Sequence, residues 1–279
     1  MSIENRKIQN LRMPELVYDP SGDVVRFNQL AVKIEMDHVS NHDYFLWLDQ
    51  AKQEIGDLVL GAEIAEKASA RVSPPLNTAV YYDTEDYSIL PTGALLRTSC
   101  NKITHAFCAF KDAEDDYGVR KDRRYVFSGE KKHLIQNAPD SAAAIGVVKE
   151  LLARKDIEHP GVHLQRALGI DPTSLFPALA LASNRFTFYV WLDKRDALRC
   201  SLDRYEVWGL RPLTEKEGRI PLSEVELAVY PRISTEISQD NRVVHLIEVL
   251  RDRLLRKFGG PVTHEIKYQR AARSLGISF

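Results

Sequence analysis

The sequence contains few cysteines and no long hydrophobic run. None of its three cysteines, Cys100, Cys108 and Cys200, stands at the spacing of a metal-binding pair. Their odd number fits reduced thiols better than a disulfide framework. No segment approaches the ~18 apolar residues of a membrane-spanning helix, and residues 1–10 are polar, without the apolar centre of a signal peptide. We therefore expect a cytoplasmic protein with no membrane partner.

The sequence also lacks an excess of charge of either sign. Lys and Arg number 38 and Asp and Glu number 39, which gives a net charge of −1. Proteins that bind nucleic acids non-specifically usually carry a basic excess, so we do not expect that activity, although the balance allows a local basic cavity. The sequence has no P-loop, no glycine motif for dinucleotides and no nucleophile elbow. These absences exclude several common nucleotide-binding and acyl-transfer sites.

Strand and helix patterns follow one another irregularly, which predicts an α+β fold. Hydrophobic residues make up 44% of the chain, enough for a sizeable core without disulfides. Without a regular strand–helix–strand repeat, a doubly wound parallel sheet is not expected. We interpret residues 1–279 as one domain in which 1–28 form an irregular lead-in. The patterns predict strands over 32–37, 78–82, 93–101, 104–111, 123–128, 179–192, 197–208 and 224–230, and helices over 41–55, 141–155, 242–258 and 267–275.

Several predicted strands carry ionisable side chains two residues apart. Lys33, Glu35 and Asp37 share one face of the first strand, because the side chains of a strand alternate. Glu224 and Glu226 repeat this spacing near the end of the chain. Carboxylates so placed suit a hard divalent cation, whereas arginine and lysine neutralise phosphate oxygens. Single basic residues lie on other predicted strands: Arg97, Lys111, Arg123 and Arg185.

Two interpretations of these charges stay open. An antiparallel sheet with one face in water shows the same alternation, and the charges then only interact with solvent. Alternatively, the strands close into a barrel whose polar interior binds a polyphosphate together with a metal ion. The spacing alone does not decide between them.

A set of ordered motifs favours the second interpretation. The segment Tyr81-Tyr82-Asp83-Thr84-Glu85-Asp86, followed by Leu95-Leu96-Arg97, resembles the central signature of the CYTH-like superfamily, the triphosphate tunnel metalloenzymes. Four later segments are similar to other elements of the family, the last of them from its polyphosphate-polymerase branch: Asn184-Arg185-Phe186-Thr187, Ser201-Leu202-Asp203-Arg204, Glu224-Val225-Glu226-Leu227 and Ile266-Lys267-Tyr268.

The resemblance implies a closed, eight-stranded antiparallel β-barrel that forms a tunnel, with flanking helices. In such a tunnel, basic residues grip a triphosphate and acidic residues bind Mg²⁺ or Mn²⁺, and water attacks a phosphorus atom. The implied metal ligands are Glu35, Asp37, Glu224 and Glu226. The implied phosphate-binding residues are Lys33, Arg97, Lys111, Arg123 and Arg185. The implied catalytic residues are Glu35, Asp37, Asp203 and Lys267.

The expected activity is metal-dependent hydrolysis of inorganic, nucleoside or thiamine triphosphate. The chain departs from the family pattern at several basic positions, among them Val39 and Ala228 in place of lysine and Ser99 in place of arginine. Because each change removes a contact, a non-catalytic tunnel that binds a phosphate ligand or nucleotide is an alternative, as is a CYTH-type adenylyl cyclase. The expected partner is a small triphosphate or nucleotide, with nucleic acid expected only as a 5′-triphosphate end.

Overall fold

The computed structural model describes residues 31–67, 70–72, 74, 76–113, 121–211, 218–230, 237 and 239–279. The expected lead-in over 1–28 lies outside these residues. Ten strands form one antiparallel sheet in the order β10-β1-β9-β8-β7-β3-β4-β5-β6, and β2 pairs with β7. The strands are β1 (Ala31–Glu35), β2 (Ala62–Glu66), β3 (Leu76–Asp83), β4 (Leu95–Asn101), β5 (Ala106–Lys111), β6 (Asp122–Val126), β7 (Phe176–Leu192), β8 (Arg195–Gly209), β9 (Ile220–Val229) and β10 (Val262–Thr263).

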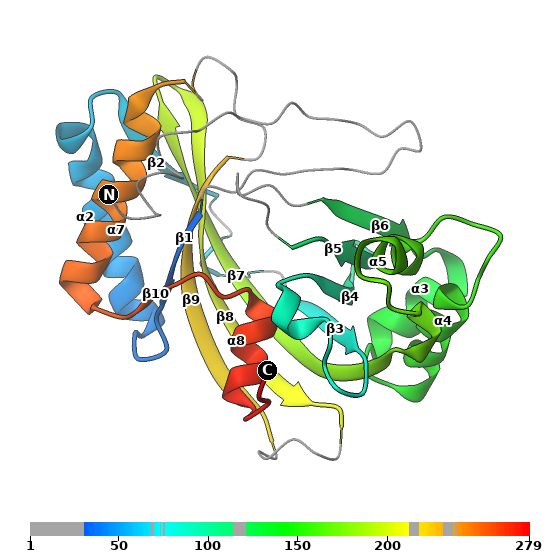
Figure 1. Cartoon of the computed structure of the whole chain (residues 1–279). Coiled ribbons are helices and arrows are strands. Elements are labelled where there is room, and N and C mark those ends of the chain that lie inside the picture. Colours follow the sequence, from blue (N-terminus) through cyan, green and yellow to red (C-terminus); the bar gives the residue numbers. More distant parts are fainter. Residues whose placement is uncertain are drawn as a thin grey trace.

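The sheet bends so that two groups of strands face one another across an inner face (Figure 1). We call β10, β1, β9 and β8 the first wing and β3, β4, β5 and β6 the second wing; β7 joins them. Helices α2 and α7 cover the outer face of the first wing, α3, α4 and α5 cover that of the second, and α8 lies between the wings. The helices are α2 (Asn41–Leu58), α3 (Gly129–Asn137), α4 (Ala142–Leu152), α5 (Pro160–Leu168), α7 (Asn241–Phe258) and α8 (Lys267–Ser274), with short 3₁₀ turns at Leu90–Thr92 and Pro172–Ser174.

The α+β class is confirmed, but the expected closed, eight-stranded barrel is wrong. The sheet has ten strands, and among the described residues β10 and β6 end the path without pairing with each other. The long strand β7 connects the parts of the sheet: its first part pairs with β3 from Leu76 to Asp83 and its last part pairs with β2 from Ala62 to Glu66. Alternation of side chains predicts which residues share a face, but it does not predict whether the edge strands meet.

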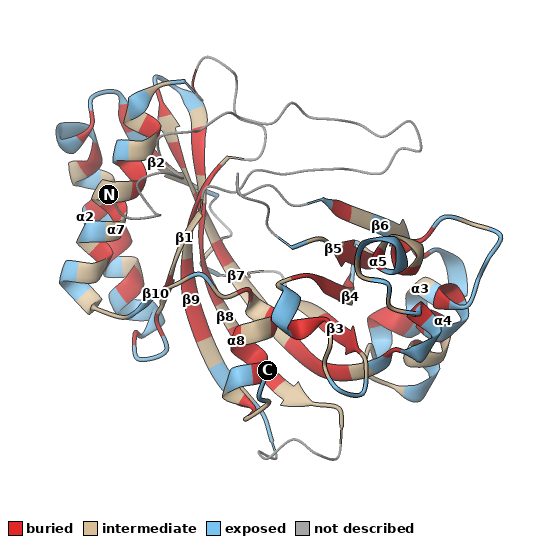
Figure 2. Ribbon diagram, viewed as in Figure 1, coloured by how far each residue is buried: buried red, intermediate tan, exposed pale blue. Residues whose placement is uncertain are grey.

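Three hydrophobic clusters hold these layers together, and their buried residues line the strands and the facing sides of the helices (Figure 2). The first joins the outer face of the first wing to α2 and α7, and the second joins the outer face of the second wing to α3, α4 and α5. The predicted apolar stripe of α7 is confirmed; its buried residues are Val243, Leu246, Ile247, Leu250 and Leu254. The third cluster lies on the inner face, under α8.

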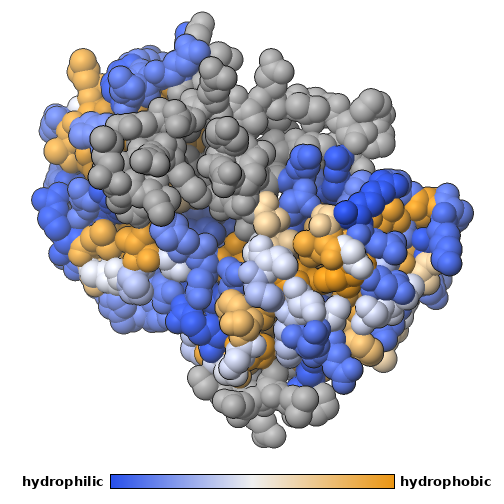
Figure 3. Space-filling view, viewed as in Figure 1, coloured by the Kyte–Doolittle hydropathy of each residue, from blue (hydrophilic) through white to orange (hydrophobic). Residues whose placement is uncertain are grey.

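The surface is mixed in character. In Figure 3, hydrophobic residues form separate patches between hydrophilic ones on the face shown. Among the described helices, none is both long and apolar enough to pass through a membrane.

Candidate functional site

A row of ionisable side chains crosses the inner face of the first wing. The register places Glu35 of β1 opposite Glu224 of β9, Glu224 opposite Asp203 of β8, and Asp203 opposite Arg185 of β7. Two residues along β1, Lys33 lies opposite Glu226. Because side chains alternate along a strand, all of these point to the inner face, while the residues between them enter the first hydrophobic cluster. The structure thus brings six of the expected site residues onto one face.

A close backbone contact fixes the end of this row. Gly260, just after α7, has φ +96°, and a Cβ there would come within 2.4 Å of the carbonyl oxygen of Glu35. The N–H of Glu35 donates to the carbonyl of Pro261 at 3.0 Å. Glycine is therefore required at 260 both for its backbone conformation and for space, and this turn holds the strand that carries Glu35.

Helix α8 brings cations to the carboxylate row. Lys267, Arg270 and Arg273 are spaced by three residues, so they share one face of the helix. The Nζ of Lys267 donates to Asp203 and lies 3.0 Å from Glu224 Oε1. Asp203 is also held by Arg185, which donates to its two oxygens at 2.7 and 2.6 Å, a bidentate geometry that fixes both partners.

Arg270 is the most enclosed cation of the site, with 2% of its surface exposed. Its Nη2 donates to both oxygens of Asp37, at 2.8 and 2.9 Å, and its Nε lies 3.5 Å from Glu35. Its Nη1 donates to the hydroxyl of Tyr205 at 3.0 Å and to Glu224 at 3.3 Å. One guanidinium thus contacts three carboxylates that sequence analysis assigned to a metal ion.

The ion pairs shift the titration of the buried groups. Burial alone would raise the pKa of Asp203, but Arg185 and Lys267 hold the pKa of this carboxyl well below its usual range. Burial also opposes ionisation of Glu224, and Lys267 again lowers its pKa. Conversely, burial would lower the pKa of Lys267, but Asp203 and Glu224 raise it. All three groups are therefore charged at neutral pH.

The signature motif docks α8 rather than facing the charged row. The rings of Tyr81 and Tyr268 stack with their centroids 4.8 Å apart, and the hydroxyl of Tyr268 donates to Asp83 at 2.8 Å. The buried Asp83 also accepts the backbone N–H groups of Ile89 and Leu90 at 2.8 and 3.0 Å. Burial raises the pKa of Asp83, and these hydrogen bonds oppose the rise. Asp83 therefore positions α8, and with it Lys267 and Arg270.

The inner face of the second wing is basic. On β4, β5 and β6 it carries Arg97, Lys111 and Arg124 with one carboxylate, Asp122, as the register shows. Asp122 accepts from Arg124 at 2.5 and 3.1 Å and lies 3.5 Å from Lys111. Burial would raise the pKa of Asp122, but Lys111 and Arg124 bring it below the usual value. Cations thus outnumber carboxylates on these strands.

Arg97 is half-buried, and only some of its hydrogen-bond donors have partners. One of its terminal nitrogens lies 3.4 Å from the hydroxyl of Tyr81. Its Nε is buried and has no hydrogen-bond partner among the described residues. A buried donor without a partner costs free energy, so this nitrogen is suited to an anionic ligand.

Arg123 does not join this group. It lies opposite Phe110, whose side chain is buried in the second cluster, so Arg123 points to the outer face of the second wing. The adjacent residue, Arg124, occupies the inner face instead and lies over the ring of Phe107 at 4.7 Å.

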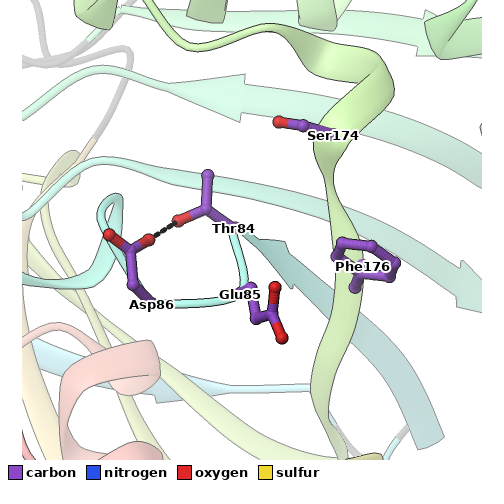
Figure 4. Close-up of a pocket in the computed structure, with 5 residues that line it drawn as sticks. All are labelled: Thr84, Glu85, Asp86, Ser174 and Phe176. Atoms are coloured by element: carbon purple, nitrogen blue, oxygen red, sulfur yellow. Dashed lines mark hydrogen bonds between the residues drawn. The ribbon is translucent and has the colours of Figure 1, made fainter.

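A pocket of about 590 Å³ lies away from the charged row, at the turn that follows β3. Figure 4 shows its five lining residues, Thr84, Glu85, Asp86, Ser174 and Phe176, and the hydrogen bond from the Thr84 hydroxyl to Asp86. Two of the residues are acidic and none is basic, so the lining does not suit a phosphate ligand. A second pocket, of about 420 Å³, contains Arg204 and Arg219. Arg204 donates to Ser223 at 2.7 Å and Arg219 to Glu206 at 3.1 Å.

Comparison with known proteins supports the architecture. No protein-family model matches the chain, and no curated protein matches it. A candidate adenylate cyclase from Bacillus halodurans matches in structure with a TM-score of 0.52 and 14% identity, over 88% of this chain and 97% of that one. This match shows that the two chains share a fold. A candidate adenylyl cyclase from Hippeastrum, described as having a dominant triphosphatase activity, matches with a TM-score of 0.46 and 13% identity, over 90% and 97%. At these identities the likeness concerns the fold alone.

The resemblance to the CYTH-like superfamily implies a divalent metal ion, but the carboxylate row does not fit one while α8 is in place. Such an ion takes carboxylate oxygens as ligands at about 2.0–2.6 Å. Here the oxygens of Asp37 and Glu224 face the guanidinium of Arg270, and those of Asp203 face Arg185 and Lys267. Within the described ranges, no group of three or more Asp, Glu, His or Cys side chains is arranged to hold an ion.

Sequence analysis missed three residues that the structure places in the site. Arg270 and Arg273 lie in the helix that was predicted over 267–275, and their spacing from Lys267 was visible in the sequence. Arg124 was missed because the expected strand did not decide which of two adjacent arginines faces inward.

Proposed function

We propose that the inner face of the sheet binds the phosphate groups of a small triphosphate, such as inorganic, nucleoside or thiamine triphosphate. The observation that carries this proposal is the buried Nε of Arg97 on the second wing, which has no hydrogen-bond partner among the described residues. Phosphate oxygens are strong acceptors for arginine, which can bind them in a bidentate manner. The CYTH-like fold is consistent with this ligand class.

The two wings have different roles in this proposal. Arg97 and Lys111 on the second wing supply the cations that bind phosphate, and Arg124 extends this surface. The carboxylates of the first wing are already neutralised by Arg185 and α8, so this wing adds little repulsion toward an anion. Binding, rather than metal-dependent hydrolysis, is the function that this distribution of charge supports best.

Hydrolysis of the bound triphosphate is the second candidate. It is favoured by Glu226, a partly exposed carboxylate whose ion pair with Arg185 is long, at 3.8 Å. A carboxylate of this kind can orient a water molecule for attack on phosphorus. The roles expected of Glu35, Asp37, Asp203 and Lys267 in catalysis stay predictions.

Calorimetric titration with tripolyphosphate, ATP and thiamine triphosphate tests the first proposal, with phosphate release measured in the same samples. We expect binding of at least one of them, and weaker binding of orthophosphate, which offers fewer oxygens. The control variant is Arg166→Met, which removes an exposed arginine of the outer helix α5 that pairs with Glu158. Absence of binding to all three triphosphates by the folded protein rejects the proposal, and release of phosphate supports the second candidate.

A further inference from the structure

We propose that α8 takes the place of a divalent metal ion in this site: Lys267 and Arg270 supply the positive charge that the carboxylates of the first wing require. The inner face therefore binds neither Mg²⁺ nor Mn²⁺ in its native arrangement. The inference goes beyond the proposed function, because it concerns the charge of the carboxylate row and holds whichever ligand the second wing binds.

The two cations contact carboxylates that the resemblance assigned to a metal ion or to catalysis. Arg270 contacts Asp37, Glu35 and Glu224 from one guanidinium, and Lys267 contacts Glu224 and Asp203 from one ammonium group. Glu224 is therefore shared between both cations, as a carboxylate is shared between two ions in a two-metal site.

The charge of Arg270 and the packing of α8 keep the cations beside the carboxylates. The guanidinium of Arg270 stays protonated at any pH that the fold tolerates, so a divalent ion near it would meet a fixed positive charge. Its helix is anchored on the inner face by Tyr268, Ala271 and Leu275, each with no exposed surface, and by the hydrogen bond from Tyr268 to Asp83. The place of the cation is thus fixed by the packing of α8.

The same geometry predicts what removal of a cation does. Uncompensated buried carboxylates are strongly unfavourable, and oxygen ligands grouped around a lost positive charge form a site that a divalent cation can fill. Replacing Lys267 or Arg270 by methionine should therefore create affinity for Mn²⁺ that the native protein lacks. A protein that already used these carboxylates for a metal ion would bind Mn²⁺ before any substitution.

Mn²⁺ binding tests the inference. It is measured by electron paramagnetic resonance and by thermal unfolding with and without 1 mM MnCl₂, a concentration about 100 times the dissociation constant expected of the variants. We expect no saturable Mn²⁺ binding by the native protein or by Arg166→Met. For Lys267→Met and Arg270→Met we expect saturable Mn²⁺ binding and a rise in the melting temperature of about 5 °C.

Stoichiometric Mn²⁺ binding by the native protein that Glu224→Gln abolishes overturns the inference, as does a folded Lys267→Met variant without Mn²⁺ affinity. If Arg270→Met does not fold, the Mn²⁺ titrations of the native protein and of Lys267→Met still test the inference. The side chain of Lys267 is 18% exposed in the native protein, so its replacement should disturb the fold less. The Mn²⁺ titration contains no phosphate compound. A failure of triphosphate binding therefore leaves this result standing, and metal binding by the native protein leaves the proposal of triphosphate binding standing.

Discussion

The two wings of the sheet share one inner face but differ in the balance of cationic and anionic side chains on it. On the first wing, carboxylates from β1, β8 and β9 meet cations from β7 and α8, so that charges of both signs are matched. On the strands of the second wing, Arg97, Lys111 and Arg124 face inward together with one carboxylate, Asp122. The first wing therefore has the character of a structural ion-pair network, whereas the strands of the second carry more inward-facing cations than carboxylates, which we propose to bind the ligand. Variants that break one wing should change stability, and variants of the other should change binding.

The largest effect is expected from Arg270→Met on the first wing. Removing one partner of a buried ion-pair network leaves uncompensated charge and costs about 3–5 kcal/mol, and Arg270 contacts Asp37, Glu35 and Glu224. Chemical denaturation measures the change in the free energy of unfolding. Arg273→Met is the matched control, because its side chain is 54% exposed and exposed pairs contribute only about 0–1 kcal/mol. Equal losses from the two variants would contradict a structural role specific to Arg270.

A somewhat smaller effect is expected from Asp83→Ala, which removes the acceptor that anchors α8. Leaving the Tyr268 hydroxyl and the buried N–H groups of Ile89 and Leu90 without this partner should cost roughly 2–3 kcal/mol. The near-ultraviolet circular dichroism of the stacked tyrosines should change as well. Asp86→Ala provides the control, since Asp86 is exposed and bonds only within its own turn. A stable Asp83→Ala variant with an unchanged tyrosine signal would show that the motif does not position the helix.

Arg97→Met tests the role of the second wing in ligand binding. We expect triphosphate binding to weaken by about 10- to 100-fold, because a charge-assisted hydrogen bond contributes about 1.5–3 kcal/mol, while the free energy of unfolding changes little. Arg123→Met is a matched control on the same sheet, since Arg123 points to the outer face. Calorimetric titration of both variants measures the difference. If Arg123→Met weakens binding as much as Arg97→Met, the ligand does not bind to the inner face of this wing.

The sequence predicted much of the first wing because strand geometry alone sets the alternation. Glu35, Glu224 and Glu226 were placed on inward faces from their spacing, and the register confirms a common face. The partners of these carboxylates were harder to foresee, because α8 reaches the row from the end of the chain and only the fold brings them together. The spacing of Lys267, Arg270 and Arg273 contained the signal, but a basic stripe on a helix also fits a solvated surface.

The second wing shows what local patterns leave undecided. A one-residue difference in register exchanges inward and outward side chains, and here it separates Arg123 from Arg124. Closure of the sheet depends on whether its edge strands, β10 and β6, pair with each other, which no local pattern contains. The resemblance carried by the motif around Asp83 agrees with the structural match at the level of the fold, while the packing role of Asp83 became visible only with Tyr268 in place.

The smallest and most gradual effect is expected from acid, and it again concerns the first wing. The pKa values of Asp203 and Glu224 are lower in the folded protein than in the unfolded chain, where such groups titrate near ~4. As the pH falls through that range, the unfolded chain takes up protons that the folded protein does not, so stability decreases with decreasing pH. The contribution of these two carboxylates to the free energy of unfolding is complete above about pH 5 and is lost progressively toward the folded pKa values.

Urea denaturation at pH 7, 5, 4 and 3 measures this dependence. Asp203→Asn should be less stable than the native protein at pH 7, and its stability should fall less steeply between pH 5 and 3, because one of the coupled carboxylates no longer titrates. Glu206→Gln, which alters an exposed pair with Arg219, should retain the native slope. Parallel profiles for the native protein and Asp203→Asn would mean that the ion pairs of the first wing do not control its stability, and the contrast between the wings would then rest on ligand binding alone.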